Sequence, residues 1–230
     1  MTTPLLAEDL LLLLLDDESG KPTGWVDLQT VLGGAVLADL ALAGLVEVEE
    51  KASVWRSAKV HAVGDRVPDD AVLAGALQTV AAKERSAQDL VGRLGKDLDD
   101  TLARRLADRG ILEREDSRVL GIFSRTRWPA ADTTREAVVR RALTAALAHG
   151  EEPDPHTRGL VALLHAVDQA HKVVDVDGVS KRDVKRRAKE LAEGDWASKA
   201  VRDAIQASVA ATTAAIAATT AATTATTATS

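Results

Sequence analysis

Near its amino end the chain carries a run of six leucines, Leu10 to Leu15, with acidic residues on both sides. A membrane-spanning helix needs about 20 apolar residues, so this run is too short to cross a bilayer. It predicts instead a helix that is buried on every side within a folded domain. The first basic residue is Lys21, so this segment lacks the basic start of a secretory signal, and we expect the protein in the cytosol.

The next apolar segment carries the start and end signals of a helix. Asp27 is a suitable N-cap, and Gly44 is suited to end the helix. Alternating side chains then predict strands over residues 46–50 and 59–63. Apolar periodicity predicts further helices over residues 70–83, 86–94, 96–109, 134–148, 156–169 and 180–193, and from Trp196 onward.

A weak internal repeat relates two helix ends. The segments LALAGLVEVEE (40–50) and LADRGILERED (106–116) share a helix, a glycine and an exiting strand. In the second copy we predict a hairpin with strands over 111–114 and 119–123 and a turn at 115–118. Pro129 ends the pairing because proline cannot donate to a strand ladder.

Composition favours packed helices. Aromatic residues make up 2% of the chain and Cys is absent, while Leu, Ala and Val supply most of the apolar surface. We therefore expect a mainly α fold: a single-domain helical bundle around the leucine-rich helix, with one or two β-hairpins. This domain covers residues 1–210, and an Ala/Thr-rich extension of the last helix with a frayed tail covers residues 211–230.

The balance of charge limits the partners. A formal charge of −6 argues against a protein built to coat nucleic acid. Two segments are nevertheless locally basic. The segment from Arg104 to Arg141 contains ten Arg and six acidic residues, and the segment from Lys181 to Lys189 contains six Lys or Arg and one acidic residue, Asp183. Each segment is either a surface for an anionic partner or a solvated helix face.

Motifs for catalysis are weak. His165 and His171 are six residues apart and do not share a helical face as metal ligands at i and i+4 would. Gly33 and Gly34 lie inside an apolar helical pattern, which indicates close packing and not a phosphate loop. We expect a non-enzymatic protein without a cofactor or a metal.

Several segments together resemble the Golgi phosphoprotein 3 family, including its bacterial, actinobacterial-type members. They are LLAEDLLLLLLDD, W-x-D followed by LADLALAGLVEV, LARRLADRGILERE, the hairpin ending in SRTRWPA, and RAKELAEGDWASKAVRDAI. The resemblance implies a helical domain that docks reversibly on membranes by holding phosphatidylinositol 4-phosphate, while an apolar hairpin tip enters the lipid. In a bacterial cell the ligand would be another anionic phospholipid.

The resemblance also implies where the headgroup site lies. Trp25 matches the family's Trp and Lys96 matches one Arg, whereas Gly33 and Asp99 stand where two further Arg are expected. Arg93, three residues before Lys96, is placed to supply a second cation if the helix is continuous. We expect headgroup binding through Trp25, Arg93 and Lys96, with reduced selectivity because Lys lacks the bidentate fork of Arg. The alternative is a packed Trp and ordinary surface cations.

The second hairpin provides a separate membrane hypothesis. Apolar side chains framed by cations suit an interface between water and anionic lipid. The residues concerned are Leu120, Ile122 and Phe123 with Arg118, Arg125 and Arg127. The alternative is a hairpin folded onto its own domain or onto a second copy of the chain, which would make the protein a homo-oligomer.

A winged-helix DNA-binding regulator is the alternative from another functional class. In LARRLADRGILEREDSRVLGIF, a recognition helix would present Arg104, Arg105 and Arg109 to DNA, and the hairpin would be the wing. The negative charge and the two apolar helices oppose it. The sequence thus predicts a cytoplasmic protein that associates peripherally with anionic phospholipid membranes.

Overall fold

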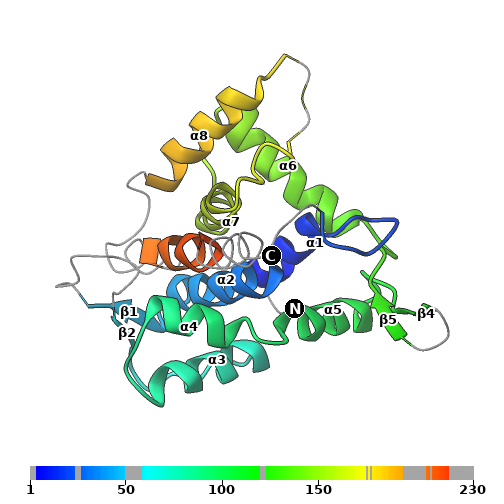
Figure 1. Cartoon of the computed structure of the whole chain (residues 1–230). Coiled ribbons are helices and arrows are strands. Elements are labelled where there is room, and N and C mark those ends of the chain that lie inside the picture. Colours follow the sequence, from blue (N-terminus) through cyan, green and yellow to red (C-terminus); the bar gives the residue numbers. More distant parts are fainter. Residues whose placement is uncertain are drawn as a thin grey trace, which may run out of the picture.

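A computed structural model describes residues 4–23, 27–49, 59–119, 123–174, 176, 178–193, 206–207 and 209–217, with side chains at 117–119 and 123–125 outside the description. Its helices are α1 (Leu6–Leu14), α2 (Leu28–Leu42), α3 (Ala71–Ala81), α4 (Ala87–Leu94), α5 (Leu98–Asp108), α6 (Thr134–Ala148), α7 (Pro155–Ala166) and α8 (Lys181–Glu193) (Figure 1). Its strands are β1 (Val46–Val48), β2 (Lys59–Ala62), β3 (Arg85–Ser86), β4 (Glu115–Val119) and β5 (Phe123–Arg127). The expected mainly α fold with small hairpins is confirmed.

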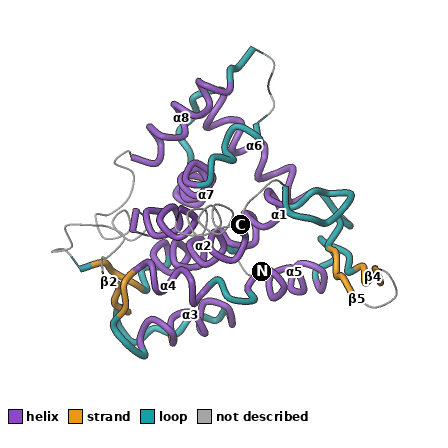
Figure 2. The backbone as a smooth tube through the Cα atoms, in the orientation of Figure 1, coloured by secondary structure: helices purple, strands orange, loops and turns teal. Residues whose placement is uncertain are grey.

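Two central helices form the core. All nine residues of α1 are buried, as are 12 of the 15 residues of α2. Helices α5, α6 and α7 pack on α1, while α3, α4, α5 and α7 pack on α2 (Figure 2). The prediction that the leucine run is buried on every side is confirmed. Each fully buried leucine contributes about 1.5–3 kcal/mol to this core.

The start and end of α2 follow the signals in the sequence. Asp27 caps the helix, because its carboxylate accepts hydrogen bonds from the Thr30 amide at 3.3 Å and from the Thr30 hydroxyl at 2.8 Å. Gly44 ends it with a left-handed φ of +68°. Within the described ranges, no helix is long and apolar enough to span a membrane.

A small antiparallel sheet, in the order β1-β2-β3, follows α2. Glu47 pairs with His61 between β1 and β2, and Val60 pairs with Arg85 between β2 and β3. The two strands predicted over 46–50 and 59–63 are confirmed, with slightly shorter bounds. Because Ser86 then caps α4, accepting from the Asp89 amide at 3.2 Å, the sheet fixes where α4 begins.

The predicted register of the second hairpin is wrong. Its strands are β4 and β5, which pair from Glu115 opposite Arg127 to Val119 opposite Phe123. The connection therefore falls on residues 120–122, not on 115–118. Polar composition suggested a turn at 115–118, but Gly121 favours a short hairpin connection and Asp116 accepts a hydrogen bond from Thr126 across the strands at 2.8 Å.

The end of the chain is described in part. Residues 206–207 and 209–217 are helical, in agreement with a last helix that extends into the Ala/Thr-rich segment. The start of that helix at Trp196 and the expected frayed tail beyond residue 217 lie outside the described residues.

Candidate functional site

The position that the resemblance assigns to one family arginine is a helix contact. A Cβ atom on Gly33 would lie 2.1 Å from the Val91 carbonyl oxygen, and one on Gly95 would lie 1.9 Å from the Gln29 carbonyl oxygen. Helices α2 and α4 thus touch backbone to backbone, and an arginine at Gly33 does not fit. The interpretation of Gly33 as a close-packing residue is confirmed.

The two predicted headgroup cations lie on either side of a break between helices. Arg93 is on α4, whereas Lys96 follows the end of that helix, so the two are not on a continuous helix face. Arg93 donates to Asp89 at 2.9 Å, and Lys96 is exposed. Asp99 is half-buried on α5, and it lines a small cavity with Asp100 and Trp128.

The remaining predicted site residues are placed only partly. Trp25, Leu120 and Ile122 lie outside the described residues, and the structure places Phe123 and Arg125 by backbone alone. Arg118 is likewise placed by backbone alone. Arg127 is the one member of the predicted hairpin set whose side chain is described, and it is half-buried. The predicted headgroup and hairpin roles therefore stay predictions.

The hairpin β4–β5 projects from the helical body (Figure 1). Within the described part of the chain, the extensive backbone contacts of each strand are with the other strand and not with a helix. Its base is held by several contacts. The guanidinium of Arg114 lies 6.0 Å from the centre of the Trp128 ring, and the amide of Ala130 donates to the Asp17 carbonyl at 2.8 Å.

Two acidic residues of α1 are enclosed by cations from three other helices. Glu8 and Asp9 are each 1% exposed. Glu8 binds Arg105 of α5 at 3.2 Å and Arg109, the residue that caps the end of α5, at 2.7 Å. The carboxylate of Asp9 accepts a hydrogen bond from Arg135 Nε of α6 at 2.7 Å, and it lies 2.8 Å from His156 Nε2 of α7. We call these six residues the α1 ion cage.

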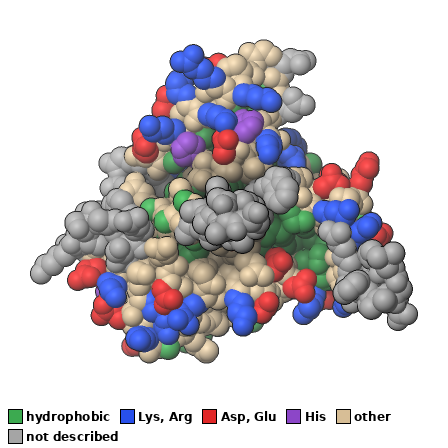
Figure 3. Space-filling view, viewed as in Figure 1, with side chains coloured by type: hydrophobic (Ala, Val, Ile, Leu, Met, Phe, Trp, Pro, Cys, Tyr) green, Lys and Arg blue, Asp and Glu red, His purple; other side chains and the backbone are tan. Residues whose placement is uncertain are grey.

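The ion cage bears on the DNA-binding alternative. Of the three arginines that this alternative directs to DNA, Arg105 and Arg109 are held by Glu8, and Arg104 binds Asp100 at 3.1 Å. The basic segment of α8 is similarly engaged: Lys185 binds Asp168, and Arg186 binds both Asp183 and Glu190. Lys and Arg side chains gather over α8 in the space-filling view, whereas both signs of charge alternate over α3–α5 (Figure 3).

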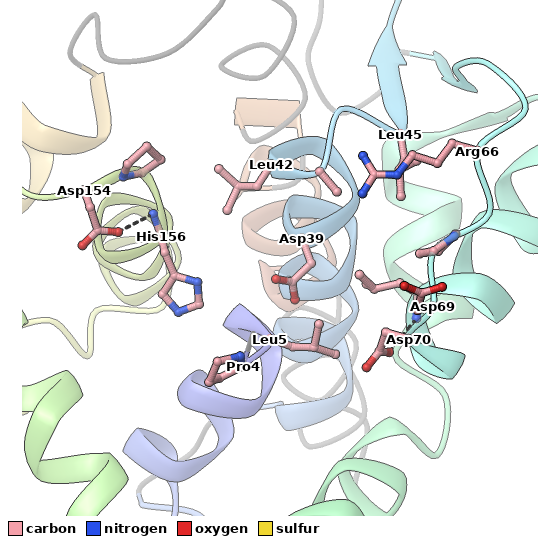
Figure 4. Close-up of a pocket in the computed structure, with 14 residues that line it drawn as sticks. Pro4, Leu5, Asp39, Leu42, Leu45, Arg66, Asp69, Asp70, Asp154 and His156 are labelled. Atoms are coloured by element: carbon pink, nitrogen blue, oxygen red, sulfur yellow. Dashed lines mark hydrogen bonds between the residues drawn. The ribbon is translucent and has the colours of Figure 1, made fainter. Parts of the chain in front are cut away.

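Next to the ion cage lies a cavity of about 620 Å³ between α1, α2, α3 and α7 (Figure 4). Its apolar lining comes from leucines, alanine and prolines, and its polar lining is mainly acidic. The polar lining residues are Asp39, Arg66, Asp69, Asp70, Asp154 and His156. Three of the carboxylates are helix caps: Asp70 caps α3, Asp154 caps α7, and Asp39 accepts from the first amides of α1.

Asp39 is the most strongly perturbed group in this cavity. It is 7% exposed, and its two oxygens accept hydrogen bonds from the amides of Leu6 at 2.8 Å and Ala7 at 3.1 Å. Burial raises the pKa of Asp39 to about 7, more than these donors and the charge of His156 lower it. Desolvation alone would lower the pKa of His156, but the adjacent Asp9, with Asp39 and Asp154, outweighs it and raises that pKa.

Sequence reasoning missed both the ion cage and the cavity. The available signal was the presence of acidic residues within apolar helical segments. Glu8 and Asp9 stand in the first such segment and Asp39 stands in the second. Buried acids need partners, but these partners are 32 to 147 residues away along the chain. Among the described residues, no three His, Cys, Asp or Glu side chains are arranged to hold a metal ion.

Together these features define a mainly α protein built on two buried helices, with a hairpin that projects from the helical body. The model of the Golgi phosphoprotein 3 (GPP34) family matches residues 6–208. The chain therefore belongs to the Golgi phosphoprotein 3 family, as its sequence motifs indicated. A comparison with curated proteins gave no match.

Proposed function

We propose that this protein associates peripherally with anionic phospholipid membranes, without catalysis, and that the β4–β5 hairpin makes the contact. The observation that carries the proposal is the projection of the hairpin from the helical body. Because the strands of this hairpin contact mainly each other, the hairpin can touch a membrane surface without any change in the packing of the helical core.

The distribution of charge along the hairpin supports this orientation. Residues 117–125 contain two arginines and no acidic residue, whereas Glu113, Glu115 and Asp116 are at the base. Strand register sets Arg118 opposite Ser124 and Ser117 opposite Arg125, so the two arginines are on neighbouring strands near the same end. Each basic residue near an anionic leaflet contributes about 1 kcal/mol of attraction.

Membership of the family supports membrane binding, but the packing of Gly33 argues for a changed headgroup site. Since an arginine is excluded there and Asp99 follows Lys96, we propose general anionic phospholipid binding instead of selective recognition of phosphatidylinositol 4-phosphate. Trp25, Arg93 and Lys96 then contribute weakly beside the hairpin.

Co-sedimentation with vesicles tests the proposal. Phosphatidylglycerol-rich vesicles should pellet the protein at low salt and less at high salt, while phosphatidylcholine vesicles should not. Phe123→Asp and Arg125→Glu should each reduce pelleting, and Lys96→Glu should reduce it less. Arg104→Glu, an exposed charge change on α5, is the matched control for net charge and should have a smaller effect than Arg125→Glu.

Two outcomes contradict the proposal: the wild-type protein stays in the supernatant with every anionic vesicle, or it pellets equally with and without the hairpin substitutions. Vesicles doped with phosphatidylinositol 4-phosphate form a further arm. A large gain in pelleting with that lipid at equal surface charge would contradict the proposed loss of selectivity.

A further inference from the structure

The cavity beside the ion cage holds a buried acidic side chain without a counter-ion. Asp39 is 7% exposed, and it lies on the cavity wall between His156 on one side and Asp69 and Asp70 on the other (Figure 4). Its two hydrogen bonds come from the first two amides of α1, which are neutral donors. The oxygens of Asp39 therefore have partners, but its charge has none.

The other buried acids of the described residues each have an arginine partner. These acids are Glu8, Asp9 and Glu136, and their partners are Arg105 with Arg109, Arg135, and Arg140, in that order. Asp39 is thus the one buried acid without an ion pair in the part of the chain that the structure describes. His156 lines the same cavity, but its ring is bound to Asp9 at 2.8 Å. Because a buried charge is costly unless it is paired, a cation in this cavity would stabilise ionised Asp39.

The remaining charges of the cavity also favour a cation. Asp70 is bound by Arg105 at 2.6 Å, whereas Asp69 and Asp154 have no ion pair within the described ranges. Arg66, which is exposed, is the one arginine of the lining. Unpaired carboxyl groups therefore outnumber unpaired cations along the lining, and an anionic ligand is disfavoured.

The walls of the cavity require an apolar group on that cation. Leu42, Leu45 and Leu73 line it together with three prolines, and its volume of about 620 Å³ is in the range of small-molecule sites. A divalent metal ion needs several oxygen ligands, and no such group of side chains occurs among the described residues. A polyamine would place further charges against the leucines. A monoamine with one apolar group fits both the buried acid and the walls.

We propose that this cavity binds a small primary amine with an apolar body, whose ammonium group lies on the carboxylate of Asp39 and whose body lies against the leucines. Each carboxylate oxygen accepts more than one hydrogen bond, so the ammonium adds to the amide donors without displacing them. Where Asp39 is protonated in the free protein, binding releases that proton to solvent. The site involves neither the hairpin nor a bilayer, so it is separate from the proposed membrane contact.

Calorimetric titration of the full chain with 2-phenylethylamine at pH 8, where an alkylamine is still charged, tests the proposal. The amine should bind with one-to-one stoichiometry. 2-Phenylethanol, which lacks the charge, and ethylamine, which lacks the ring, should each bind at least tenfold more weakly, and 3-phenylpropionate should not bind. Asp39→Asn should weaken 2-phenylethylamine at least tenfold. Asp65→Asn, an exposed charge change outside the cavity, is the matched control and should bind as wild type does.

A second pair of variants leaves Asp39 in place and tests the walls. Ala43 is half-buried and lines the cavity, so Ala43→Leu should fill part of it and weaken 2-phenylethylamine at least tenfold. Ala74→Leu is the matched control, because Ala74 is also half-buried but does not line the cavity, and it should leave the affinity unchanged.

The affinity for 2-phenylethylamine should also depend on pH. Since burial raises the pKa of Asp39 to about 7, its carboxyl group ionises between pH 6 and 8, and the affinity should rise about tenfold over this interval. His156 and Glu8 are the charged groups that act on Asp39 from α7 and α1. Loss of charge on His156 acts in the same direction as ionisation of Asp39. Asp70 and Asp154 have lowered pKa values and stay ionised throughout.

Three outcomes overturn the proposal: wild-type protein does not bind 2-phenylethylamine, Asp39→Asn or Ala43→Leu binds it as wild type does, or the affinity falls as pH rises from 6 to 8. Asp39→Asn should still pellet with anionic vesicles, and Phe123→Asp should still bind 2-phenylethylamine. Failure of the amine site is therefore separable from failure of the membrane contact.

Discussion

Replacing Asp39 with Asn should flatten the pH dependence of stability between pH 5 and 8. Burial raises the pKa of Asp39 from 3.8 to about 7, so the folded state holds a proton that the unfolded state has released. Stability from this group is therefore present below the unfolded pKa and is lost as pH rises towards 7. One tenfold change in proton affinity is worth about 1.4 kcal/mol, so the loss amounts to about 4 kcal/mol at most.

Two other groups with raised pKa values act in the same direction. The raised pKa of His156 gives stability that is present below about 6.5 and is lost as pH rises through the folded value. The raised pKa of Glu136, which is also buried, adds a loss above its usual range. The lowered pKa values of Asp70 and Asp154 affect stability only at more acid pH. Comparison of Asp39→Asn with wild type isolates the contribution of Asp39.

Urea denaturation at pH 5, 6, 7 and 8 measures the effect. The wild-type free energy of unfolding should fall by a few kcal/mol across the series. Asp39→Asn should show a smaller fall, from a lower value at pH 5, because its amide group leaves one of the Leu6 and Ala7 donors unpaired at a cost of about 1–3 kcal/mol. A wild-type stability that rises with pH, or a variant with the wild-type slope, would refute the reasoning.

Further substitutions test the helix contact at Gly33, the ion cage and the end of α2. Gly33→Arg, which introduces the arginine that the resemblance led us to expect there, should destabilise the protein by more than about 3 kcal/mol in urea denaturation, because its Cβ collides with the Val91 carbonyl; wild-type stability would contradict this contact. Asp9→Asn should cost about 3–5 kcal/mol by removing the buried carboxylate that Arg135 and His156 share, and Asp100→Asn, at an exposed pair, should cost less than about 1 kcal/mol. Gly44→Ala should lower the thermal midpoint, because alanine is strained at a φ of +68°, and an unchanged midpoint would count against that conformation.

Local signals account for the features that the sequence predicted well. The cap at Asp27, the terminating Gly44 and apolar periodicity act within a few residues, so they placed the helices within about three residues of their observed bounds. The continuous burial of α1 followed from the leucine run alone.

Non-local contacts account for what the sequence did not predict. Hairpin register depends on which strand residues pair, and the acidic segment 115–118 forms part of β4 because Asp116 finds Arg114 and Thr126. The partners of Glu8, Asp9 and Asp39 come from helices far along the chain. No local pattern identifies those partners, so the cavity beside the ion cage emerges only from the assembled fold.

An environment-sensitive fluorophore at the hairpin tip tests the membrane contact most directly. Because the chain has no Cys, Ile122→Cys gives a single labelling site, and Lys83→Cys, exposed after α3, gives the matched control. On adding phosphatidylglycerol vesicles, the label at 122 should shift to the blue and brighten, while the label at 83 should not change. No change at 122 while the protein co-sediments with the vesicles, or equal changes at both sites, would contradict insertion of the hairpin.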